Sequence, residues 1–170
     1  MIKKRIKILN IGICILLSAL ILSNVGYAQQ THIRDYVIYS ATGSHIGSSI
    51  TIHGGSVGSQ SLVQSTGTTI FNSNIFSGNK IIIANSNTIN GRTTAANSSA
   101  SSGNILSIGS NTYISGNIDV KGDISISGGT VNGRVTHPAG TIYSGPVPSL
   151  GEIIGVPQLQ IGRASCRERV

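Results

Sequence analysis

The chain has 170 residues, a formal net charge of +7 and two cysteines, and charged residues make up only 10% of it. The basic charge is concentrated at the two ends, so that residues 29–160 keep five basic and four acidic side chains, a net charge of +1. This nearly neutral segment excludes binding to nucleic acid or to an anionic membrane surface that is driven by overall charge. Cys14 and Cys166 also lie in the ends. Residues 29–160 therefore form no disulfide and no thiolate metal site.

Residues 1–28 have the pattern of a secretory signal peptide. Lys3, Lys4, Arg5 and Lys7 precede a mostly apolar run that ends near Leu22. Small residues follow, which predicts cleavage between Ala28 and Gln29. The apolar run is short for a membrane-spanning helix. We therefore expect export, with no stable membrane span after cleavage.

The central segment repeats short strand-like motifs. Ile50–Val57 reads ITIHGGSV and returns as ISISGGTV at Ile124–Val131. Apolar residues recur in pairs two positions apart, which places both side chains on one face of a strand. Isolated apolar residues between the pairs are further candidates for the core. The pairs are Ile50/Ile52, Ile81/Ile83, Ile118/Val120 and Ile124/Ile126, and the single positions are Val57, Ile70, Ile89, Val131, Val135 and Ile142.

Short strands with Gly and Asn at the corners are typical of β-solenoids. The pattern predicts an all-β chain: a right-handed parallel β-helix of about five coils over residues 46–145, each coil about 18–22 residues long. An antiparallel sandwich is the alternative. Residues 29–45 are predicted to cap the first coil, because an open solenoid end exposes unpaired strand edges. The prolines in 146–160 predict a linker toward a downstream region.

The last ten residues, 161–170, depart abruptly in composition from the preceding chain. They can be encoded by a string that looks like a widely used DNA sequencing adapter read in frame. We therefore interpret them as an assembly artefact, and we expect the natural product to continue beyond Gln160.

Few residues suggest a catalytic or metal-binding site. Asp119 and Asp123 lie close together in sequence and are weak candidates for a calcium site, although calcium prefers six to eight oxygen ligands. Glycoside hydrolysis needs two carboxyl groups across a cleft, and no nucleophile motif accompanies the scattered histidines. The sequence therefore predicts no catalytic residues, no cofactor and no firm metal site.

Several short motifs recur between Tyr36 and Pro148: GGSVG at 54–58, ANSN at 84–87, GRTTAAN at 91–97, GNIDV at 116–120, GGTV at 128–131 and HPAGT at 137–141, followed by GP at 145–146. Through these motifs the chain resembles the N-terminal region of large secreted surface proteins of gliding Gram-negative bacteria. Such proteins often end in a gliding-motility-type or type IX secretion sorting domain. The stretch NIDVKGDISI, residues 117–126, is also similar to bactofilin-type polymer-forming β-helices, which are usually cytoplasmic.

These observations together predict a secreted or cell-surface module that is structural or adhesive and not an enzyme, here as the N-terminal fragment of a larger protein. Its expected partners are polysaccharide or other cell-surface material, with self-association through the coil ends as a further possibility. The alternatives are the non-catalytic part of a carbohydrate-active β-helix protein and a self-assembling polymer.

Overall fold

The structure is a computed structural model, and it describes residues 35–97, 103–157 and 159. The expected signal peptide, its cleavage pair Ala28 and Gln29, and residues 161–170 lie outside the described residues. Among the residues that are described, no helix has the length and apolar character needed to cross a membrane.

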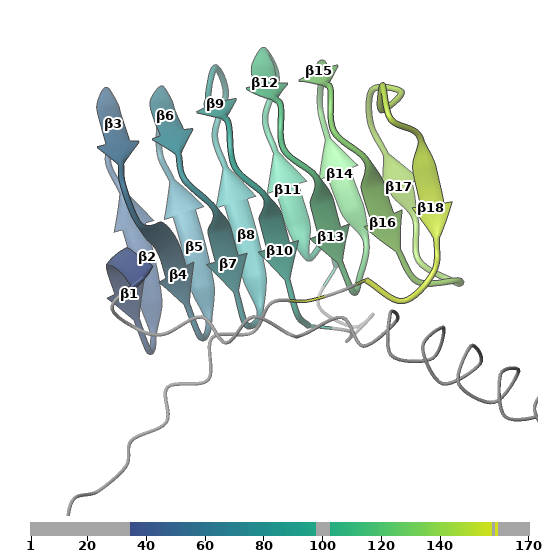
Figure 1. Cartoon of the computed structure of the whole chain (residues 1–170), viewed down its shortest axis with the longest axis horizontal. Coiled ribbons are helices and arrows are strands. Elements are labelled where there is room, and N and C mark those ends of the chain that lie inside the picture. The colour runs from purple at the N-terminus through teal and green to yellow at the C-terminus, as the bar shows by residue number, and fades with distance from the viewer. Residues whose placement is uncertain (1–34, 98–102, 158, 160–170) are drawn as a thin grey trace, which may run out of the picture.

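The described chain is a β-solenoid of about six coils built from three parallel sheets (Figure 1). Every strand pair is parallel, which excludes the antiparallel sandwich. In Figure 1 the strands in front run downward and the strands behind them run upward, while the coils advance from left to right. This winding is right-handed, as the sequence predicted, and it is the hand that parallel crossover connections strongly prefer.

Sheet A has seven strands, with each strand hydrogen-bonded to the equivalent strand of the next coil. It opens the first coil and also ends the solenoid. Its strands are β1 (Tyr36–Ser40), β4 (Ser56–Ser59), β7 (Ile75–Ser77), β10 (Thr93–Ala95), β13 (Ile118–Val120), β16 (Val135–His137) and β18 (Glu152–Ile154).

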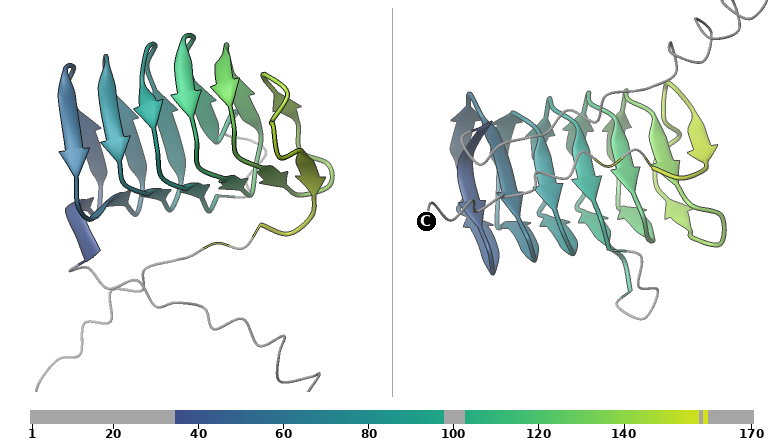
Figure 2. Two further views of the ribbon diagram at one scale, coloured as in Figure 1. Left: turned by 45° about the horizontal axis from the view of Figure 1, so that its top comes forward. Right: turned by 60° about the horizontal axis from the view of Figure 1, so that its bottom comes forward.

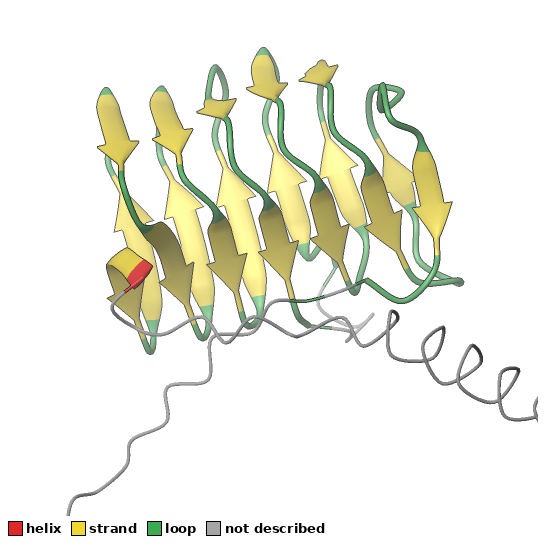
Figure 3. Ribbon diagram, viewed as in Figure 1, coloured by secondary structure: helices red, strands yellow, loops and turns green. Residues whose placement is uncertain are grey.

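Sheets B and C complete each coil, with six and five strands respectively. Figure 3 shows how short the loops are between most of the strands. Sheet B contains β2 (Gly43–Ile46), β5 (Leu62–Ser65), β8 (Lys80–Ile83), β11 (Leu106–Ile108), β14 (Ile124–Ile126) and β17 (Tyr143–Ser144). Sheet C contains β3 (Ile50–His53), β6 (Thr69–Asn72), β9 (Thr88–Ile89), β12 (Thr112–Ile114) and β15 (Gly129–Val131).

The solenoid extends further at both ends than the sequence predicted. Residues 29–45 were expected as a cap, but β1 and β2 in this segment are the first strands of sheets A and B. Residues 146–160 were expected as a linker, but β18 pairs with β16. The structure has about six coils, close to the predicted five, because strands outside 46–145 also join the ladders.

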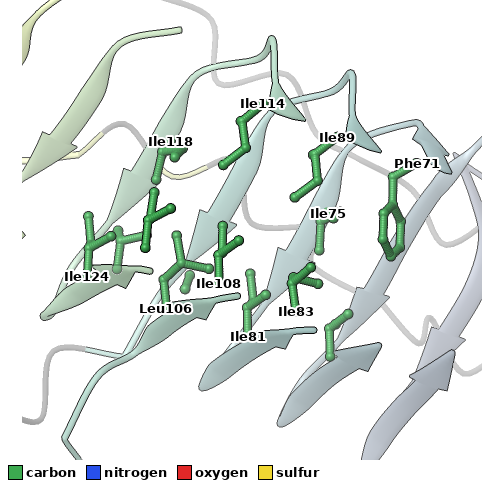
Figure 4. Close-up of a cluster of buried hydrophobic side chains, with 14 of the residues drawn as sticks. Phe71, Ile75, Ile81, Ile83, Ile89, Leu106, Ile108, Ile114, Ile118 and Ile124 are labelled. Carbon is green, nitrogen blue, oxygen red and sulfur yellow. The ribbon is translucent and has the colours of Figure 1, made fainter. Parts of the chain in front are cut away.

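The core is a stack of inward-facing β-branched side chains from all three sheets (Figure 4). The predicted pairs Ile81/Ile83, Ile118/Val120 and Ile124/Ile126 are all buried in it. In sheet C, Ile52, Phe71, Ile89, Ile114 and Val131 lie in register and face inward. Burial of this apolar stack is the main favourable contribution to folding.

Three predicted core positions are exposed instead, although Ile50 lies on the same face of β3 as the buried Ile52. Ile50 and Ile70 are 41% and 38% exposed, and Ile142 is 67% exposed. In β6 the inward position belongs to Phe71, which is fully buried. Adjacent apolar residues leave the strand register ambiguous, because a shift of one residue exchanges the two faces.

Glycines allow the coils to stack closely at the corner between sheets C and A. A Cβ atom built on Gly116 would overlap the carbonyl oxygen of Gly91, and one on Gly133 would overlap that of Gly116. No side chain fits between these backbones. The recurring Asn-Gly and Ser-Gly corners of the sequence are therefore a steric requirement of the stacking.

Candidate functional site

The outer face of sheet C carries a regular array of mostly polar, uncharged side chains. Two outward positions recur in each coil: one within the strand and one two residues later, at or just after the strand's C-terminal end. Figure 2, left, brings this sheet toward the viewer. We call the array the sheet C face, and it consists of Thr51, His53, Ile70, Asn72, Thr88, Asn90, Tyr113, Ser115, Thr130 and Asn132.

Side chains at the strand ends of this face are joined into a ladder that crosses four coils. The Asn72 amide donates to Nδ1 of His53 at 3.2 Å, and the Asn90 amide donates to Oδ1 of Asn72 at 2.7 Å. Ser115 Oγ then donates to Oδ1 of Asn90 at 3.2 Å. Because each side chain bonds its neighbour in the next coil, the amide groups are held in fixed orientations.

Tyr113 stands in the middle of the sheet C face. It is 43% exposed, and it lies in register between Thr88 and Thr130 on the adjacent strands. Its hydroxyl oxygen accepts a hydrogen bond from the Asn132 amide at 2.9 Å. The ring is therefore anchored at its polar tip while much of its surface remains open to solvent.

The outer face of sheet A is different, because its central side chains are buried. Asp119 is only 1% exposed and accepts a hydrogen bond from Nε of Arg92 at 2.8 Å. Its register neighbours Thr94 and Thr136 are also buried. A buried carboxylate needs such a partner, since leaving it unpaired costs several kcal/mol, about 3–5 in comparable cases. We therefore assign the Arg92–Asp119 pair a structural role.

A small hollow lies on this same face, between the first four coils of sheet A. It has a volume of about 30 Å³. Sites for small organic ligands typically occupy about 300–1,000 Å³. The hollow therefore has room for a few water molecules but not for a sugar ring. It is lined by Tyr36, Ser56, Asn74, Ile75, Phe76, Arg92 and Thr94.

A second polar cluster closes the C-terminal end of the solenoid. Nε2 of the buried His137 lies 2.8 Å from Oε1 of Glu152, and Nδ1 lies 2.9 Å from Oγ1 of Thr141. Nearby, Tyr143 donates its phenolic proton to the carbonyl of Pro146. Burial and the negative charge of Glu152 together raise the pKa of Tyr143 to about 12. Polar groups thus cover the end of the apolar core.

The structure places the two calcium candidates in different contacts. Asp119 pairs with Arg92, whereas Oδ1 of Asp123 accepts a hydrogen bond from the backbone N–H of Ile142 at 2.9 Å. Within residues 35–97, 103–157 and 159, no group of three or more His, Cys, Asp or Glu side chains could hold a metal ion. Calcium binding at Asp119 and Asp123 stays a prediction.

The three histidines among the described residues are spread over the three sheets. His45 lies on the outer face of sheet B, His53 begins the ladder of sheet C, and His137 faces inward from sheet A. Sequence reasoning did not find this ladder of side chains. The available signal was the spacing of 18 residues between Asn72 and Asn90, which equals one coil.

Comparison of the chain with family models, curated proteins and solved structures finds no match. The resemblance to bactofilin-type β-helices agrees with the observed β-solenoid. Function must therefore be argued from the solenoid and its surfaces.

Proposed function

We propose that this chain is a non-catalytic structural module, a stiff solenoid spacer that is exported and stands at the cell surface as part of a larger protein. The observation that carries the proposal is the continuous three-sheet stack with one shared core. In a solenoid each coil supports the next, so the whole resists bending as a unit. Export and surface location are supported by the signal-like residues 1–28 and by the resemblance to surface proteins of gliding bacteria.

A structural role is supported by the contacts of the ionisable side chains. Asp119 forms an ion pair with Arg92, and Asp123 accepts a hydrogen bond from the backbone N–H of Ile142. Glu152 contacts the imidazole of His137. These groups bond protein partners that hold coils together. A pair of carboxylates that served glycoside hydrolysis would instead face each other across a substrate cleft.

A self-assembling polymer is the second candidate, and the C-terminal end favours it. β18 is the last strand of sheet A, and among the described residues no further strand pairs with its outer edge. Ile153 and Ile154 on this strand are 44% and 66% exposed. An exposed edge with apolar side chains is a template for pairing with another chain. Head-to-tail contacts of this kind do not close and would produce filaments.

The proposal is tested by locating the chain in a Gram-negative host and by assaying the purified chain against plant, algal and bacterial polysaccharides. We expect the chain at the outer surface or in the medium, accessible to added protease, and no shortening of any polysaccharide. A Leu16→Arg variant, which interrupts the apolar run of the expected signal, should stay in the cytoplasm. Retention of the unaltered chain in the cytoplasm, or depolymerisation that disappears in Asp119→Asn, would overturn the proposal. Filaments of purified chain in electron micrographs would favour the polymer.

A further inference from the structure

We propose that the sheet C face is a docking platform for a neutral, linear polysaccharide, with Tyr113 as its stacking residue. This inference rests on the proposed surface role, and it names the partner of the module and the side chains that contact it.

The absence of charged side chains from the sheet C face favours an uncharged partner. None of the ten residues that define the sheet C face is Asp, Glu, Lys or Arg, and only His53 and Tyr113 among them are titratable. The charged side chains described in the structure lie on the other faces or corners, including Lys80, Arg92 and Asp119. A polyanion such as a uronate polymer or a nucleic acid requires cationic contacts, which this face does not offer.

Tyr113 supplies the apolar contact that a sugar ring needs. An aromatic ring presents a large apolar surface together with a polar tip, and it loses little conformational freedom on binding because few of its bonds rotate. Here the bond from Asn132 fixes the tip, and the ring is 43% exposed. Two strands away, Ile70 adds an exposed apolar side chain in the same outward column. The C–H face of one pyranose can lie against Tyr113, and another ring of the same chain can lie against Ile70.

The ladder supplies the polar contacts. Asn90 donates one amide hydrogen to Asn72 and accepts from Ser115. A primary amide has a second hydrogen and a second lone pair, which remain for a hydroxyl group of the ligand. Because the ladder already fixes the orientation of these amides, binding costs less side-chain entropy than it would for free asparagines.

The repeat of the platform suits a polymer. Equivalent side chains of successive coils are separated by one strand spacing, about 4.8 Å. The same donor and acceptor chemistry therefore recurs along the solenoid axis, and a chain of repeating sugar units can contact several rungs together. Each rung contributes a weak contact, and linked contacts reinforce one another.

The test measures retention of the purified full chain by neutral glucans, mannan and xylan in affinity electrophoresis, with polygalacturonate as the charged comparison. We expect at least one neutral glycan to bind and polygalacturonate to have no effect. Tyr113→Ala should weaken that binding at least tenfold. Ile82→Ala, which removes an outward apolar side chain from sheet B, should leave it unchanged. Thr130→Arg places a bulky charge beside Tyr113 and should weaken binding to a similar degree.

Failure of every neutral glycan to bind would overturn the inference, as would preferential binding of polygalacturonate. Unchanged binding in both Tyr113→Ala and Thr130→Arg would overturn it as well. Each variant is accepted only if its melting temperature lies within a few degrees of the unaltered chain, and Thr130→Arg keeps the test decisive if Tyr113→Ala does not fold. A chain that reaches the surface but binds no glycan would refute this inference and leave the proposed spacer role intact.

Discussion

Two adjacent isoleucines in β8 provide a direct test of the solenoid register. Ile81 is fully buried between Val63 and Leu106, whereas Ile82 points outward and is half-buried. Ile81→Ala removes three carbons from the core, a transfer loss of about 2.4 kcal/mol at about 0.8 kcal/mol each. The cavity left behind brings the expected loss to about 3–4 kcal/mol. Ile82→Ala should cost about 1 kcal/mol or less, because solvent already reaches that side chain.

Both substitutions replace isoleucine by alanine in the same strand, so the loss of intrinsic β-propensity is common to both. The difference between them, about 2–3 kcal/mol, measures burial alone. For a folded segment of this size it corresponds to a difference in melting temperature of about 8–12 °C. Circular dichroism during thermal and urea unfolding measures both variants against the unaltered chain. Equal losses at Ile81 and Ile82 would refute the inward and outward assignments of sheet B.

Three further outcomes follow from specific contacts. Gly116→Ala should lower the melting temperature strongly, because the new methyl group would overlap the carbonyl of Gly91, and a melting curve like that of the unaltered chain would contradict the close stacking. Asp119→Asn should destabilise the fold by about 3 kcal/mol, because it breaks the buried pair with Arg92. The loss of stability should be the same with and without calcium, and a loss seen only when calcium is present would favour a metal site. Tyr143 has its pKa raised to about 12 by burial and then by Glu152, so its neutral form contributes stability that is complete below pH 10 and is lost between about pH 10 and 12. Spectrophotometric titration at 295 nm and unfolding at several pH values should show this loss in the unaltered chain and a smaller one in Tyr143→Phe.

The sequence predicted the core best where apolar residues alternate with polar ones. Ile124 and Ile126 flank Ser125, and the structure buries both isoleucines in sheet B. The prediction failed in β6, where Ile70 and Phe71 are adjacent and only one can face inward. Size decides there: the larger aromatic ring fills the interior, and the outward isoleucine loses less by exposure.

The ends and the surface were harder to predict. β1 lacks the Gly and Asn corners that mark the later coils, so its membership of sheet A follows only from its pairing with β4. The sheet C face depends on which side chains of different coils come into register. One coil takes 18 residues between Asn72 and Asn90 but 25 between Asn90 and Ser115. The longer fourth coil hides the period from any search at a fixed spacing.

The asparagine ladder and Tyr113 make separable contributions to the sheet C face. Asn72 and Asn90 link neighbouring coils, so their hydrogen bonds have a role in stacking whether or not a ligand binds. The ring of Tyr113 is largely outside the core, and the fold does not require an aromatic side chain there. Asn90→Ala should therefore lower both the melting temperature and glycan retention, whereas Tyr113→Ala should lower retention with little change in melting. Tyr113→Ala could instead lower the melting temperature as much as Asn90→Ala, with glycan retention falling only in proportion to that loss of stability. The ring would then be part of the scaffold, and recognition would have to be sought on another face.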